Sequence, residues 1–303
     1  MRTVRKIAVI VIWVCLLAAV LDLGYMLEKK LNEYRIALDK HTERTLEARK
    51  GRDVDFKKLK KQNPDTKGWI WLSGTNIDYP IVQGPDNDYY LHRDFDGNYL
   101  YDGCIFIDAA VKTPFSPDEN TVIYGHRMRS GAMFNNLGKY ADKEFFDENP
   151  VIIIETEDGS YDLHVIAFCT ELSDSDLYTT SFYNGLHSQP ELFDDIDGFD
   201  DAGGLMTKAD FVDLVRKKAV NISDEDFSTD DTFVTLSTCA YSSGEHRNQV
   251  IGILKDAALD EKNVVITEQK PFVNRWLLAQ IGVGLLMIFA VVFTAASLFR
   301  KDR

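Results

Sequence analysis

Short apolar runs separated by turn residues fill the chain from Gly68 to Leu254. Eight runs have the length and the β-branched and aromatic content of strands: GWIWL, IDYPIV, CIFID, NTVIYG, VIIIET, YDLHVIAFC, TFVTLSTC and QVIGIL, with a further candidate at NVVIT. Turn residues separate most of them, and Glu157 to Ser160 predicts a hairpin between two such runs. Many short strands without alternating long helices predict a mainly β fold, built as a closed or sandwiched sheet.

Helical patterns occur between these strands and before them. Ser130 to Tyr140 and Asp142 to Asn149 are short candidates, whereas Thr207 to Ala219 has a stronger pattern, with Thr207 as N-cap and Asp210 three residues later. Glu28 to Gln62 is polar and rich in helix formers, which predicts a helical stalk followed by a second helix.

Two long apolar segments lie near the ends of the chain, Ile7 to Leu27 and Trp276 to Phe299. A membrane-spanning helix needs about 20 such residues, so we expect one at each end. Basic residues before the first segment and after the second predict that both termini are cytoplasmic and that the intervening domain is extracellular. A cleaved signal peptide is the alternative for the first segment, but no small-x-small cleavage site follows it.

The predicted organisation follows from these boundaries. It comprises a cytoplasmic tail at 1–6, a transmembrane helix at 7–27, a stalk with N-terminal helices at 28–62, a folded domain at 63–268, a second transmembrane helix at 276–299 and a tail at 300–303. The expected localisation is therefore the cell membrane, with membrane lipid as a partner.

Charge and cysteine content narrow the function classes. The net charge of −14 and the lack of a basic stripe argue against nucleic acid as a partner. Four cysteines are too few for a disulfide scaffold in a domain of this size. Cys104 and Cys169 lie in apolar strand-like runs, which predicts buried, inert thiols. The acidic segment from Glu191 to Asp201 could be a calcium loop, but its spacing differs from an EF-hand and favours a solvated acidic surface.

One constellation carries chemistry. Cys239 stands where one predicted strand ends, and Arg247 stands where the next begins, so a short loop would bring them together. His126 also follows a strand end. A nucleophilic thiol needs a partner that stabilises the thiolate and then protonates the leaving amine, and histidine can do both. It also needs a fixed cation near the developing oxyanion. The chain contains no phosphate loop, GxGxxG, HExxH, CxxC or GxSxG motif that would favour another chemistry.

At these residues the sequence resembles a known family. TLSTC (Thr235 to Cys239), with an arginine eight residues later, resembles the sortase active-site signature. VIYGHRMRSGAMFNNLGKY (Val122 to Tyr140) resembles the histidine segment of class B sortases. NPDTKGWIWLSGTNIDYPIVQGPDNDYYLHRDF (Asn63 to Phe95) resembles the opening stretch of the same class. The similarity covers roughly residues 63 to 267.

The resemblance implies an eight-stranded sortase β-barrel and a cysteine transpeptidase without metal or cofactor. By this resemblance Cys239 attacks the sorting signal of a secreted protein, His126 protonates the leaving amine, and Arg247 stabilises the oxyanion. A cell-wall peptidoglycan precursor amine then resolves the thioester. The resemblance also implies that Asn87, Leu91 and Ser237 lie near the substrate groove, and that the signal is similar to Asn-Pro-x-Thr.

Three alternatives stay open. A C-terminal span is more familiar in pilin-polymerising class C sortases than in class B, which leaves a pilin lysine as a possible acceptor. A cysteine protease that only hydrolyses would use the same acyl-enzyme. A non-catalytic extracellular binding module would retain the fold with an inert Cys239.

Overall fold

The computed structural model describes residues 18, 22, 24–26, 28, 49–50, 52–128, 131–172, 176–180, 182, 206–239 and 246–257. Contacts within the chain divide it into two units, and the second, Ala48–Lys270, contains all the strands discussed below. The domain boundaries expected from the sequence remain predictions.

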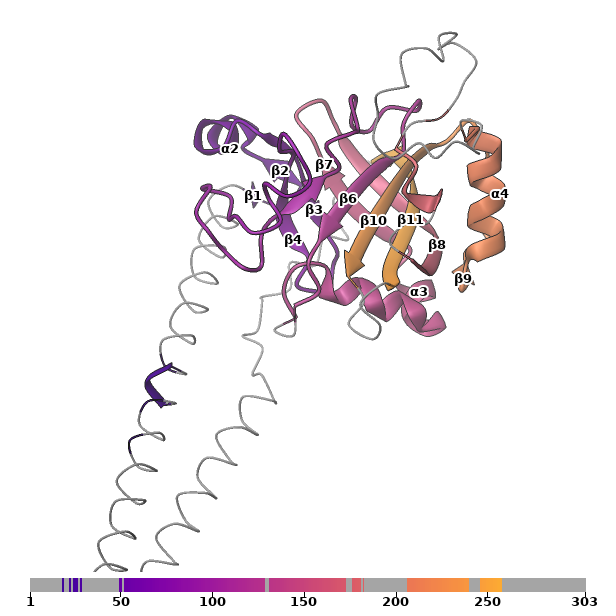
Figure 1. Cartoon of the computed structure of the whole chain (residues 1–303). Coiled ribbons are helices and arrows are strands. Elements are labelled where there is room, and N and C mark those ends of the chain that lie inside the picture. The colour runs from indigo at the N-terminus through magenta and orange to yellow at the C-terminus, as the bar shows by residue number, and fades with distance from the viewer. Residues whose placement is uncertain are drawn as a thin grey trace, which may run out of the picture. The chain divides into compact units, whose positions relative to one another are not determined.

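Eight strands close into a barrel (Figure 1). Their order is β11-β10-β6-β5-β4-β3-β7-β8, and pairing between β8 and β11 closes the ring. The strands are β3 (Thr66–Trp71), β4 (Asp78–Val82), β5 (Ile105–Ile107), β6 (Thr121–Gly125), β7 (Val151–Glu155), β8 (Ser160–Leu172), β10 (Thr232–Cys239) and β11 (His246–Asp256). The prediction of a mainly β fold with an eight-stranded barrel is confirmed, and each predicted strand run within the described ranges forms one of these strands.

Alternation along the strands produces an inner and an outer core. Every barrel strand contributes to the inner cluster; Ile70, Ile123, Val234 and Val250 are examples, each fully buried. Neighbouring side chains such as Phe233 point the other way and pack in a second cluster with residues of α4. This is the pattern expected when both faces of a strand are covered, one by the barrel interior and one by an external helix.

Short helices and small strands surround the barrel. They are β1 (Arg49–Lys50), β2 (Asp53–Val54), α2 (Phe56–Gln62), η1 (Phe134–Ala141), α3 (Lys143–Glu148), η2 (Asp176–Tyr178), α4 (Lys208–Lys218) and β9 (Asn221–Ile222). Of these, η1 and η2 are 3₁₀ helices. Thr207 caps α4 through a capping box with Asp210, as the sequence predicts. Figure 1 shows α4 beside the barrel, next to the edge formed by β8 and β9.

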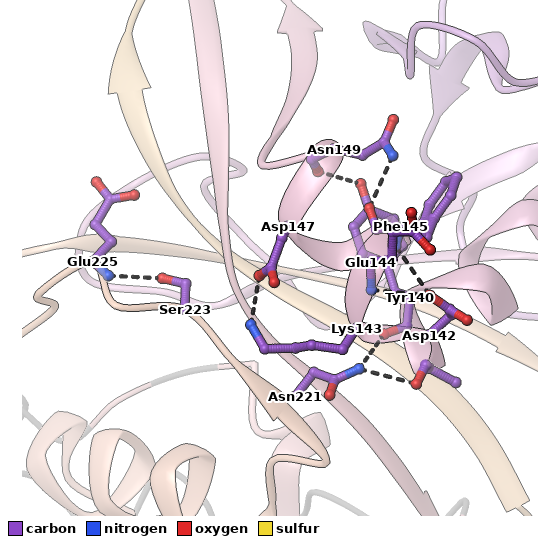
Figure 2. Close-up of polar contacts among 11 residues, drawn as sticks. Tyr140, Asp142, Lys143, Glu144, Phe145, Asp147, Asn149, Asn221, Ser223 and Glu225 are labelled. Carbon is purple, nitrogen blue, oxygen red and sulfur yellow. Dashed lines mark hydrogen bonds and ion pairs between the residues drawn. The ribbon is translucent and has the colours of Figure 1, made fainter.

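Figure 2 shows how η1 and α3 are joined to β9. Asn221 of β9 donates its side-chain amide to the carbonyls of Tyr140 and Ala141, at 2.8 and 3.0 Å. Asp142 then caps α3, because its carboxylate accepts from the backbone N–H of Glu144 at 2.9 Å and of Phe145 at 3.1 Å. These contacts fix η1 against the barrel, and the first residue of η1 is bonded to the candidate site.

The prediction of a cell-membrane localisation with two spans is corrected for the part of the chain that the structure describes. A span needs about 20 apolar residues, and no described helix is long and apolar enough to cross a membrane. The helix α4, for example, has 11 residues and several charged side chains. Most of 7–27 and all of 276–299 lie outside the described residues, as does the NVVIT candidate strand.

The predicted stalk is described only in part. Its second helix corresponds to α2, which Asp55 caps by accepting from the backbone N–H of Lys58 at 2.9 Å. Just before it, β1 and β2 pair as a two-stranded hairpin that the sequence did not predict. Residues 29–48 lie outside the described ranges.

Candidate active site

The ends of three adjacent strands meet at the candidate site. Cys239, the last residue of β10, is the Cα partner of Arg247 near the start of β11. On the other side of β10, Thr238 is the Cα partner of Gly125 in the parallel strand β6. His126 follows Gly125 directly, so its backbone lies level with that of Cys239. The structure therefore brings the three residues predicted to be catalytic to one end of three neighbouring strands.

Close packing positions His126. A Cβ on Gly125 would lie 2.5 Å from Ile105 Cδ1 and 2.8 Å from the ring of Phe134, so only glycine fits beneath this ring. Phe134, the first residue of η1, donates its backbone N–H to the carbonyl of His126 at 3.0 Å. Met133 precedes it with a positive φ of 53° and donates its N–H to the Tyr79 hydroxyl at 3.1 Å. The hydrogen bond from Phe134 therefore holds the backbone of His126, and the strained turn at Met133 holds Phe134 in place.

The imidazole of His126 is neutral at physiological pH. Burial, together with the charges of His92 and Arg247, lowers the pKa of His126 from 6.5 to about 4. A neutral imidazole can accept a proton from a thiol and later return it to a leaving group. The influence of Arg247 on this pKa also indicates that its guanidinium lies within electrostatic reach of the ring.

Two of the three residues predicted to bind substrate belong to hydrogen-bonded networks. Asn87 donates its amide to the carboxylate of Asp108 at 3.1 Å and accepts from the N–H of Ala109 at 2.8 Å. The same carboxylate accepts from the hydroxyl of Tyr124 at 2.8 Å. Through these two hydrogen bonds Asn87 fixes the first residues of the segment that follows β5.

Ser237 lies two residues before Cys239 on β10 and is buried. Its hydroxyl shares a hydrogen bond of 2.7 Å with the hydroxyl of Tyr178 in η2. The ring of Tyr178 stacks on Tyr124 with centroids 6.1 Å apart. Ser237 is thus connected through two tyrosines to strand β6, which His126 directly follows.

Leu91, the third predicted substrate-binding residue, is partly buried and packs against an outer apolar cluster that includes Trp69 and Phe106. The same loop carries His92, whose ring lies 5.5 Å from that of His126, and Tyr101, whose ring lies 6.1 Å from it. Sequence reasoning did not select these two residues. The signal that could have found them is the density of aromatic side chains between residues 89 and 101.

Cys104 and Cys169 are buried, as predicted, and their inertness stays a prediction. Both side chains are thiols outside any disulfide, and burial raises the pKa of Cys169 to about 12. Within the described ranges, no group of three or more His, Cys, Asp and Glu side chains could hold a metal ion. The acidic segment 191–201, considered above as a calcium loop, lies outside those ranges.

A closed eight-stranded barrel with cysteine, histidine and arginine at adjacent strand ends has the groups that a thiol-dependent acyl-transfer enzyme would use. Comparison with known proteins identifies the family. Residues 70–254 match the model of the sortase domain. Sortase B of Listeria monocytogenes is 35% identical over 185 residues, which cover 61% of this chain and 67% of that protein. Sortase B of Staphylococcus aureus is 28% identical over 228 residues, covering 75% and 82%.

A solved structure agrees with these relatives. The X-ray structure of Clostridium perfringens sortase B superposes with a TM-score of 0.55 at 29% identity, covering 67% of this chain and all of that one. The chain belongs to the sortase family, and its relatives identify it as class B. The resemblance predicted from sequence is confirmed. Sortases are cysteine transpeptidases that act on proteins bearing sorting signals and on cell-wall precursors, and this chain is an enzyme of that type.

Proposed function

We propose that this sortase cleaves the C-terminal sorting signal of secreted proteins and transfers them to an amine of the cell-wall peptidoglycan precursor. Cys239 is the nucleophile, His126 the acid–base, and Arg247 the stabiliser of the oxyanion. The observation that carries the proposal is the strand register, in which Cys239 is the Cα partner of Arg247 and Thr238 that of Gly125.

The first half-reaction follows from the neutral state of His126. The Cys239 sulfur forms a bond to the scissile carbonyl carbon while the thiol proton passes to the imidazole. The C–N bond then breaks, and the leaving amine takes that proton from His126. An arginine at this position carries a permanent charge and several N–H donors, so it stabilises the oxygen that becomes negative in the tetrahedral intermediate.

The second half-reaction runs in reverse order with a different amine. The acceptor nitrogen forms a bond to the thioester carbon, the C–S bond breaks, and the proton lost by the nitrogen returns through His126 to the sulfur. Water in place of the amine would give hydrolysis, and a pilin lysine in place of a wall amine would give a polymer. The chemistry at Cys239 is the same in all three cases.

Mass spectrometry of the acyl-enzyme tests the proposal. The chain is incubated with a peptide that carries an Asn-Pro-x-Thr signal, and the thioester adduct is located on the protein. We expect Cys239→Ala to form no adduct and Cys104→Ala to behave as the wild type. Arg247→Ala should slow adduct formation by about 100- to 1,000-fold, the usual cost of losing an oxyanion donor. Adduct formation by the Cys239→Ala variant would refute the assignment.

Product analysis then separates the reaction types. The same peptide is incubated with and without triglycine as an amine acceptor. A product extended by triglycine supports transpeptidation, whereas a free carboxylate in both conditions would support a protease that only hydrolyses.

A further inference from the structure

An aromatic face lies beside His126 in the loop between β4 and β5. It consists of His92, Tyr99 and Tyr101, and we call it the aromatic face below. The ring of His92 stacks on Tyr101 with centroids 5.6 Å apart and lies 6.4 Å from Tyr99. Both His92 and Tyr101 reach the ring of His126, at 5.5 and 6.1 Å. The rings thus form a continuous path from the surface to the candidate acid–base.

The two tyrosines are exposed although their positions are well fixed. Tyr99 is 78% exposed and Tyr101 61%, among the most exposed large apolar side chains of the described chain. The loop folds back on itself, because Leu100 donates its N–H to the carbonyl of His92 at 3.1 Å. The Nδ1 atom of His92 is 3.1 Å from the carbonyl of Tyr101. Exposed rings held in this way are accessible to a ligand without first having to be ordered.

The charge of the loop favours a cation. Between residues 86 and 103 it contains five aspartates and one arginine. That arginine, Arg93, is engaged by Tyr89: its guanidinium lies over the Tyr89 ring at 4.5 Å and donates to the Tyr89 carbonyl. Asp102 directly follows Tyr101 and is half-buried. Burial raises the pKa of Asp102 to about 6, so this carboxylate is ionised at neutral pH.

We infer that the aromatic face binds the ammonium form of the acceptor amine and delivers it to His126. This inference rests on the function proposed above, because an acceptor is needed only if the thioester is resolved by an amine. Aromatic π faces with nearby carboxylates are a common environment for ammonium groups. The neutral imidazole at the end of the path takes one proton from the ammonium group and releases it to solvent before the nitrogen attacks. The second proton, which the nitrogen loses on attack, returns through His126 to the sulfur as described above.

Arg247 explains why such a face is needed. Its positive charge lies within electrostatic reach of His126, so an approaching ammonium group is repelled at the point where it must be deprotonated. The π faces of the aromatic face and the negative charge of its loop offset this repulsion. An uncharged nucleophile meets no such repulsion and has no need of the aromatic face.

Two kinds of nucleophile distinguish this role from a structural one. The full chain is acylated with the signal peptide, and the thioester is resolved either by a cationic amine or by hydroxylamine, which is uncharged at neutral pH. Triglycine and Nα-acetyl-lysine amide serve as cationic amines and compare an α-amine with a side-chain amine. The quantity measured is the KM of the cationic amine divided by the KM of hydroxylamine.

We expect Tyr101→Ala to raise this ratio by about 3- to 30-fold, as the range of cation–π energies implies. Tyr101→Phe retains the π face and should stay close to the wild type. Val220→Ala, at an exposed position next to β9, is the matched control and should change nothing. If Tyr101→Ala does not fold, the KM ratio is measured with Tyr99→Ala instead. The ring of Tyr99 is more exposed than that of Tyr101, so its removal disturbs the fold less.

An unchanged ratio in the alanine variants would overturn the inference, and so would an equal loss with both nucleophiles. Neither result would affect the proposed function, because the thioester would still form on Cys239. Absence of the thioester in the wild type would instead refute the proposed function itself. The two failures are therefore distinguishable in one set of assays.

Discussion

Replacing Gly103 by alanine measures how closely the loop of the aromatic face is packed. Gly103 has a positive φ of 62°, and a Cβ there would lie 2.4 Å from the carbonyl oxygen of Leu91 and 2.5 Å from that of Tyr90. Both are backbone atoms, which cannot move aside as the end of a side chain can. The next residue, Cys104, donates its N–H to the Tyr90 carbonyl at 3.0 Å, so the clash occurs where the loop is bonded together.

Gly97 provides a matched control in the same loop. It has a φ of 82°, but a Cβ there would meet nothing within 4 Å. Gly97→Ala thus costs only the left-handed backbone conformation, about 1–2 kcal/mol. Gly103→Ala adds overpacking of about 1–3 kcal/mol, for a total of about 2–5 kcal/mol. The entropic effect of losing a glycine from the unfolded chain is shared, so the difference of about 1–3 kcal/mol is the quantity to compare.

Urea unfolding gives the two free energies, and hydrogen exchange at the Cys104 amide shows whether the loop opens separately. If it does, the global loss is limited by the free energy of local opening, and exchange at Cys104 accelerates instead. Gly103→Ala should also raise the KM for cationic acceptors, because Tyr101 lies two residues away. Equal losses in the two variants by both methods, within about 0.5 kcal/mol, would refute the close packing.

Three further predictions concern the barrel and the site. The pKa of His126, lowered to about 4, predicts that acyl-enzyme formation holds its rate down to about pH 5 and falls below it as the imidazole is protonated. An acid limb centred on the ordinary value of 6.5 would contradict this prediction. Gly125→Ala should cost about 1–3 kcal/mol in urea unfolding and slow acylation by displacing the ring of Phe134, and unchanged stability would count against it. Arg52→Met removes the partner 3.0 Å from the buried carboxylate of Glu155 and should cost about 3–5 kcal/mol near pH 7.5. Burial raises the pKa of Glu155 above its ordinary value of 4.5, so the loss should shrink as the pH falls to that value and the carboxyl takes up a proton. An equal loss at pH 7.5 and at pH 4.5 would contradict this.

The strands could be predicted from sequence because their signal is local. Runs such as VIIIET and TFVTLSTC contain the residues that favour strands and end at turn residues, and the hairpin between Glu155 and Ser160 has the predicted position. Closure of the barrel is not local. The pairing of β8 with β11 joins residues 161–172 to 246–256, and no pattern in either strand specifies its partner. The strands β1, β2 and β9 were missed because two residues carry no periodicity.

The candidate site was predictable where motif and strand end coincide. Cys239, His126 and Arg247 were selected in this way, and the register brings their backbones together. The aromatic face was not selected, because His92 and Tyr101 are brought to His126 by a folded-back loop rather than by a strand. The placing of Asn87 near the substrate groove, which the resemblance implies, stays a prediction. The hydrogen bonds of its side-chain amide with Asp108 and Ala109 depend on the folded chain and could not be predicted from sequence.

The parallel pairing of β6 with β10 has a consequence for the order in which the chain can fold during synthesis. Parallel neighbours require a crossover, and here 106 residues separate Gly125 from Thr232, the residues that end β6 and begin β10. The last strand of the ring, β11, carries Arg247 and is paired on both sides, so it can be inserted only after β8 and β10 exist. During synthesis, a chain that has not yet released residue 256 has an open sheet and an incomplete site. The three candidate catalytic residues therefore come together only when β11 has joined the sheet between β8 and β10.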